Sequence, residues 1–212
     1  MEEQNVYKVK KNGKSDEAKL KYTELCYSKI DKAKELLNKG DANGCVFLEV
    51  AEIYAKKANI AVPEEIELLK PKAHEVFANY NFTVAKETLE TDPGGSIASL
   101  LLVEEHTELA NVKLPADFES VKRMAYENGI NAKIKDAEDA LKADNYEGAI
   151  GLLSIAKSYA EKIKLPVPAK VEELEKKAQH IIACFSMINN VKGESKIVME
   201  GIKRMQRSKK DV

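Results

Sequence analysis

Three segments of this chain repeat one pattern of small and apolar residues at a spacing of about 52 positions. Alanine and leucine recur just before a turn, at Ala33, Ala85 and Ala137 and at Leu37, Leu89 and Leu141. A proline, followed by apolar residues three and six positions later and by alanine ten positions later, recurs at Pro63, Pro115 and Pro168. A repeat of this length indicates a stacked array, in which each unit buries its apolar face against its neighbours.

The composition favours helices over strands. Aromatic residues make up only 6% of the 212 positions, and alanine, leucine, glutamate and lysine dominate the long segments. Strands would require alternating β-branched and aromatic residues between turn signals. We therefore predict an all-α fold: a right-handed stack of three helical hairpins, an α-solenoid, that ends in a C-terminal capping helix.

The pattern also predicts where the helices and domains lie. We expect a flexible basic N-terminal arm over 1–14, a helical-repeat domain over 15–191 and a basic amphipathic helix and tail over 192–212. The expected helices share apolar positions three and four residues apart, and cover 15–39, 43–59, 64–91, 94–112, 116–143, 146–163, 169–191 and 194–208.

The turns carry helix start and stop signals. Each proline of the repeat suits the start of a helix, where its missing N–H costs nothing. Pro71 would lie inside a helix and predicts a kink or a new helix start there. Aspartates are expected to cap the second helix of each hairpin, and the spacing of Asp144 and Glu147 matches a capping box.

One stretch carries a family resemblance. It runs from Ala137 to Ala160 and includes the following residues: Leu141, Asp144, Asn145, Tyr146, Glu147, Gly148, Ala149, Ile150, Leu153, Ala156 and Tyr159. It resembles a tetratricopeptide-type helical hairpin, and it is equally similar to an uncharacterised archaeal helical-hairpin domain. The period here is longer than the tetratricopeptide unit of about 34 residues. The resemblance implies binding of a peptide or protein partner and no catalysis.

Charge is unevenly distributed along the chain. Residues 1–21 carry six lysines against four acids, and residues 192–212 carry seven basic residues against three acids. The formal net charge of the whole chain is −1, which leaves residues 22–191 at −7. The repeat body is therefore acidic and the two ends are basic.

Cysteines and the N-terminal segment indicate an intracellular chain. Cys26, Cys45 and Cys184 are an odd number without a CxxC spacing, so we expect reduced, buried thiols and neither disulfides nor zinc. The first residues are acidic and no apolar run follows them, and no stretch is long and apolar enough to span a membrane. These features predict a cytoplasmic location.

Few residues suggest chemistry, and we expect neither catalytic residues nor a metal or cofactor. His74 and His180 flank the apolar stripe, out of phase for a shared site. His106 occupies the same repeat position as Tyr54 and Tyr159, where a ring with a polar tip can line a groove. These three residues are the candidate partner-binding site, although they could equally cap the core with their tips in water.

The C-terminal tail is the second candidate site. Five basic residues cluster on and after the last expected helix: Lys203, Arg204, Arg207, Lys209 and Lys210. Ile197, Val198, Ile202 and Met205 form an apolar stripe beside them, so this basic amphipathic helix could bind a polyanion, anionic lipid or a protein. Alternatively, the stripe caps the array and the basic residues remain solvated.

Three functions remain open from the sequence. The first is a non-enzymatic helical-repeat scaffold or adaptor that binds a protein partner. The second is a nucleic-acid-binding protein that uses its lysine-rich termini. The third is a structural protein that assembles with itself by contact between end repeats. The oligomeric state and the partner are not determined by the sequence.

Overall fold

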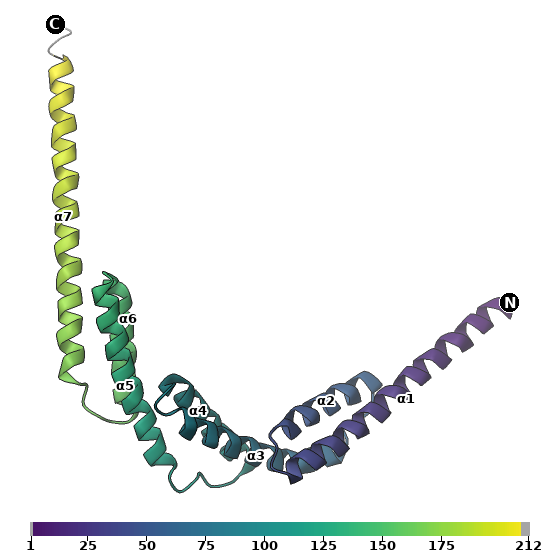
Figure 1. The fold of residues 1–212 in the computed structure, drawn as a ribbon. Helices are drawn as coiled ribbons and strands as arrows, with labels where there is room; N and C mark the ends of the chain where they lie inside the picture. Colours follow the sequence, from purple (N-terminus) through teal and green to yellow (C-terminus); the bar gives the residue numbers. More distant parts are fainter. Residues whose placement is uncertain (1, 209–212) are drawn as a thin grey trace. The chain divides into compact units, whose positions relative to one another are not determined.

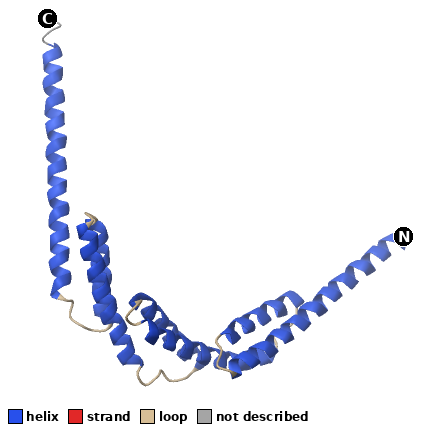
Figure 2. Cartoon of the chain, viewed as in Figure 1, coloured by secondary structure: helices blue, strands red, loops and turns tan. Residues whose placement is uncertain are grey.

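The computed structural model describes the backbone of residues 2–208 and the side chains of residues 16–188, and in this part of the chain helices are joined by turns and loops (Figures 1 and 2). The helices are α1 (Glu2–Asn38), α2 (Asn43–Ala58), α3 (Glu64–Thr88), α4 (Pro93–Ala110), α5 (Phe118–Lys142), α6 (Tyr146–Lys162) and α7 (Ala169–Ser208). No strand occurs among residues 2–208. The all-α prediction is confirmed.

Two expected helix boundaries are wrong. Helix α1 begins at Glu2 instead of residue 15. Helix α7 runs from Ala169 to Ser208 without the expected break before residue 194. The reason is the same in both places: one glycine, Gly13 or Gly193, stands near the expected break, and a single glycine costs a helix only about 1 kcal/mol.

Helix α3 continues through Pro71, where we expected a kink or a new start. A proline inside a helix removes one backbone hydrogen bond and crowds the preceding turn. Both neighbouring turns of α3 have partners, since Ile66 and Ala73 are buried in the core of the same part of the chain. Tertiary packing therefore outweighs the local cost.

The turns that precede α3, α5 and α7 share one backbone hydrogen bond. The carbonyl of each repeat proline accepts a hydrogen bond from the N–H three residues later, at 3.0, 3.0 and 2.9 Å in the three copies. Asp92 caps α4 by accepting from the Gly95 N–H, as expected. Asn145 caps α6 in the same way, through the Gly148 N–H, so the capping box expected at Asp144 is wrong. Asp144 instead adopts a positive φ of 58°.

The second helix of each hairpin ends with a left-handed residue at the same repeat position. Asn59 and Asn111, at the C-caps of α2 and α4, have φ of 52° and 54°, and Lys164 after α6 has φ of 55°. Asparagine tolerates this conformation better than most residues. The asparagines at a spacing of 52 positions were a sequence signal for these helix ends.

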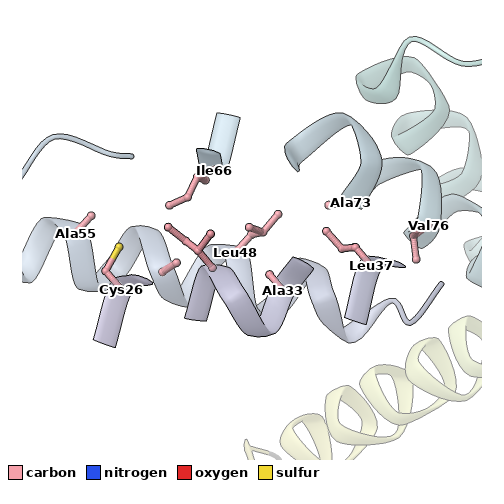
Figure 3. Close-up of a cluster of buried hydrophobic side chains, with 10 residues drawn as sticks. Cys26, Ala33, Leu37, Leu48, Ala55, Ile66, Ala73 and Val76 are labelled. Atoms are coloured by element: carbon pink, nitrogen blue, oxygen red, sulfur yellow. The ribbon is translucent and has the colours of Figure 1, made fainter. Parts of the chain in front are cut away.

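The chain divides into two compact units, and the first spans residues 1–125. In it α1 packs along α2 and α3 packs along α4, with further contacts of α3 to α1 and α2. Figure 3 shows a cluster of buried side chains from α1, α2 and α3 that forms much of this core. Its members are Cys26, Ile30, Ala33, Leu37, Leu48, Ala51, Ala55, Ile66, Ala73 and Val76.

The second unit spans residues 126–212. Its core combines side chains of α5, α6 and α7. The buried members are Ile130, Ala137, Ala149, Leu153, Ala156, Ala160, Val171 and Leu174. Four of these are alanines, and small side chains allow the helices to approach closely.

Burial follows the sequence repeat. The alanines are buried in every copy, at Ala33, Ala85 and Ala137 and at Ala73, Ala125 and Ala178. Small buried residues also stand near the start of each second helix: Gly44, Ser96 and Ala149. At Gly44 an added Cβ would lie 2.6 Å from Cγ of Leu37, so this position of the first hairpin requires glycine. The positions that hold alanine in all three copies are therefore core positions.

Candidate functional site

Each of the three side chains predicted to form the partner-binding site packs against a second ring. That ring comes from the helix that precedes its own in the chain. Tyr54 pairs with Tyr22, His106 pairs with His74, and Tyr159 pairs with Tyr126. The three partners, on α1, α3 and α5, are themselves 52 residues apart. A ring pair therefore occurs at equivalent sequence positions in all three copies of the repeat, with tyrosines in two copies and histidines in the middle one.

The two tyrosine pairs are contacts between aromatic rings. The rings of Tyr22 and Tyr54 stack with centroids 6.0 Å apart, and the ammonium group of Lys57 lies 5.8 and 5.9 Å from their centroids. The rings of Tyr126 and Tyr159 meet edge to face at 5.4 Å. Such pairs contribute about 0.5–1.5 kcal/mol beyond the area that they bury.

The histidine pair is the most chemically distinctive contact of the first unit. Nδ1 of His74 and Nδ1 of His106 are 2.9 Å apart, which is a hydrogen-bond distance. The His106 ring also lies on Phe77, with centroids 4.5 Å apart. One imidazole must donate and the other must accept, so the bond exists only while at least one ring is neutral.

The surroundings of His74 favour its neutral form. Partial burial is the main cause that lowers its pKa, and the nearby His106 and Lys70 lower it further. Glu105 opposes these effects. When both rings are protonated, two N–H donors face each other, and two positive charges lie in contact.

His74 is a site residue that the sequence reasoning missed. It was expected to be out of phase with a shared site, yet it contacts His106 directly. The available signal was the register of Tyr22, His74 and Tyr126, which matches the register of their partners. His180, by contrast, is exposed on α7, with Nε2 3.7 Å from Sγ of Cys184.

The three thiols are free. Cys26 is fully buried in the first core, and burial raises its pKa. Cys45 is half-buried, and its thiol donates a hydrogen bond of 3.1 Å to the Ala73 carbonyl. Burial raises the pKa of Cys45 as well. Raised pKa values suppress the reactive thiolate form at neutral pH, so these two side chains act as core residues.

Among the side chains of residues 16–188, no group of three or more His, Cys, Asp or Glu residues is placed to hold a metal ion. Hollows in the described part include one of about 330 Å³ and one of about 590 Å³. The smaller one lies between α5 and α7 and is lined mainly by charged side chains, among them Glu138, Lys170 and Lys177. Neither hollow includes a residue of the ring pairs.

The predicted polyanion-binding residues lie outside the described side chains. This holds for Lys203, Arg204 and Arg207, which belong to the helical backbone of α7, and for Lys209 and Lys210 beyond it. Their role stays a prediction from the sequence.

Comparison of the chain with protein-family models, with curated proteins and with solved structures finds no match. Within the described residues, none of the helices combines the length and the apolar character that crossing a membrane requires.

The histidine pair predicts a stability that depends on pH. Because the pKa of His74 lies below its ordinary value of 6.5 in the folded chain, the unfolded chain binds protons more readily. Stability is therefore fully present above that value and falls as the pH drops through it. We expect the free energy of unfolding, measured by urea unfolding, to be lower at about pH 5 than at neutral pH, because the unfolded chain then binds a proton that the partly buried His74 binds less readily.

The chain supplies its own control for this prediction. The double variant His74→Tyr, His106→Tyr gives the middle hairpin the ring pair of the other two, and it should lose most of the difference between the two pH values. The variant His74→Gln, His106→Gln tests the same point if the larger rings do not fit beside Phe77. An unchanged pH dependence in both variants would show that other groups cause it.

Proposed function

We propose that this protein is a non-enzymatic helical-repeat scaffold or adaptor that binds a protein partner. In this proposal the hairpins α1–α2, α3–α4 and α5–α6 continue one right-handed stack that α7 ends. Such arrays bind other macromolecules along an extended surface. A cytoplasmic location remains a prediction from the sequence.

One repeated apolar position on the second helices supports the proposal. Val50 on α2, Leu102 on α4 and Ile155 on α6 are equivalent in the repeat, and all three are large and apolar. Leu102 is 36% exposed and Ile155 is 41% exposed, while Val50 is half-buried. A single exposed apolar residue needs no explanation, but the same position left in solvent in successive copies indicates a contact surface.

Neighbouring side chains extend this surface in the first unit. Val46 and Ile53 on α2 and Leu101 and Leu109 on α4 are also exposed. The surface suits a partner that presents apolar side chains, such as an amphipathic helix or an extended peptide.

The acidic body makes the nucleic-acid alternative weaker for this surface. Residues 22–191 carry a formal charge of −7, so the repeats themselves repel a polyanion. Attraction to nucleic acid would have to come from the basic ends, and their affinity would fall steeply with salt. Aromatic residues that could stack on bases are absent from residues 192–212.

The proposal predicts that the repeated apolar position determines partner capture. The variant Leu102→Lys, Ile155→Lys places two charges on the surface, and it should reduce capture of a specific partner from the native host at least about tenfold. The measurement is quantitative affinity capture with the full chain as bait. Leu68→Lys is the matched control. Leu68 is 71% exposed but lies on α3, the first helix of its hairpin, and therefore outside the proposed surface on the second helices.

Three outcomes would contradict the scaffold. Capture that is equally reduced by Leu68→Lys would show a nonspecific loss of apolar surface. Binding of duplex DNA or RNA tighter than about 1 μM at physiological salt would favour the nucleic-acid function, since nonspecific binding is normally weaker than that. A molar mass in solution that grows with concentration, without any captured partner, would favour self-assembly.

A further inference from the structure

Ion pairs link each hairpin to the first helix that follows it, and they occur at equivalent positions of the repeat. One set joins the first helix of each hairpin to the start of the helix that follows that hairpin, which is α3, α5 or α7. Its members are Lys34–Glu65 at 3.3 Å, Lys86–Asp117 at 2.7 Å and Glu138–Lys170 at 3.6 Å. The first two have the same polarity, and the third is inverted.

A second set shows the same inversion. It joins the second helix of each hairpin to the helix that follows the hairpin. On that following helix, the paired residue lies five positions after the one used in the first set. Its members are Glu52–Lys70 at 2.9 Å, Glu104–Lys122 at 2.6 Å and Lys157–Glu175 at 2.5 Å. Again the first two have one polarity and the third has the other.

The four paired residues at the last junction therefore carry charges opposite to those of their counterparts at the first two junctions. Glu138 and Lys157 belong to the α5–α6 hairpin, and Lys170 and Glu175 belong to α7. Both attractions are preserved, because each change is matched by the opposite change in its partner. All four residues lie in the second unit, whereas the ion pairs of the first two junctions, which share the opposite polarity, lie in the first unit.

Stability alone does not explain the inversion. The paired side chains are partly exposed, and isolated ion pairs of this kind contribute little whichever partner is positive. Polarity matters only when the wrong helix occupies the junction. A helix with the charges of α3 would place Glu65 against Glu138 and Lys70 against Lys157, so that both attractions become repulsions.

We propose that these two ion pairs select which helix docks on which hairpin. The α5–α6 hairpin accepts a helix with lysine followed by glutamate five residues later, as in α7, and rejects the acid-then-lysine order of α3 and α5. This selectivity keeps α7 docked on the α5–α6 hairpin of its own chain. It also prevents α7 of one molecule from docking on the first two hairpins of another.

The same positions carry no such charges on α1. Gly13 and Ala18 stand where α3, α5 and α7 have their junction residues. Helix α1 therefore lacks both charges that would pair it with the last hairpin of a second copy. The junction charges thus favour assembly within one chain over head-to-tail growth.

Charge-swap variants of the full chain test the proposal. One variant swaps α7 (Lys170→Glu, Glu175→Lys), one swaps the hairpin (Glu138→Lys, Lys157→Glu), and the third combines all four changes. Net charge is unchanged in each. Each two-residue swap should lower Tm by about 4 °C or more at low salt, and the four-residue variant should recover most of the loss.

Two controls separate selection from ordinary stabilisation. The swap Glu172→Lys, Lys176→Glu changes exposed charges of α7 outside the junction and should leave Tm nearly unchanged. The neutral variant Lys170→Gln, Glu175→Gln removes the attractions without adding repulsions, so it should lower Tm clearly less than the α7 swap does. Hydrogen exchange of the α7 amides reports on this docking directly.

The outcomes are decisive in either direction. Recovery in the four-residue variant, a milder neutral variant and smaller shifts at about 1 M salt would support the proposal. Losses that add up in the four-residue variant would overturn it, because the charges would then act independently. Equal losses in the neutral variant and the α7 swap would also overturn it, because repulsion would then contribute nothing.

Discussion

Replacing Phe118 by alanine is expected to lower the free energy of unfolding by about 3–5 kcal/mol. Phe118 is the first residue of α5, and its side chain is 1% exposed. Its ring lies 6.1 Å from the Phe82 ring. Removing it loses apolar burial and leaves a cavity between α3 and α5, which the rigid helices around it can fill only in part.

Urea unfolding followed by circular dichroism measures this loss. Tyr80→Ala is the matched control, because Tyr80 on α3 is largely exposed. The control should cost less than about 1 kcal/mol, as surface substitutions usually do. If Phe118→Ala were as mild as the control, Phe118 would not be part of the core that the repeat assigns to Ile66, Phe118 and Val171.

Replacing Leu153 by alanine is expected to cost about 2–5 kcal/mol in the second unit. Leu153 on α6 is fully buried within the core cluster of α5, α6 and α7. Four members of that cluster are alanines, whose side chains have no rotamers with which to fill the space that the missing atoms leave.

Ile155→Ala provides the control on the same helix, two residues further on. It removes a side chain of the same composition from the exposed face of α6. Thermal unfolding should show a small effect for Ile155→Ala and a large one for Leu153→Ala. Similar effects in the two variants would contradict the helical phase of α6, and with it the assignment of Ile155 to the proposed partner surface.

Much of the fold could be predicted from the sequence, because the relevant information is local or periodic. Apolar residues three and four positions apart predicted the helices, and the prolines at 63, 115 and 168 marked the helix starts. The recurrence of alanine at 73, 125 and 178 predicted burial, since a position that stays small in each copy marks a close contact between helices. These signals need no knowledge of which helices meet.

Cap and break positions were harder to predict, because several local solutions have similar energies. Asp144 and Asn145 are both good cap residues, and the choice of Asn145 leaves Asp144 with a positive φ. Pro71 and Gly193 oppose helix formation locally, yet α3 and α7 continue through them. Differences of about 1–3 kcal/mol decide such positions, and packing elsewhere can outweigh them.

The sequence by itself determined that this chain is helical, where most of its helices lie and which small residues are buried, because each of these depends on residue type and spacing. Only the tertiary structure decided which side chains meet: His74 with His106, the ring pairs of the other hairpins, and the ion pairs whose polarity inverts at α7. Those contacts join residues 18 to 33 positions apart, on different helices. Their partners follow from how the helices pack and cannot be derived from the periodicity of one helix.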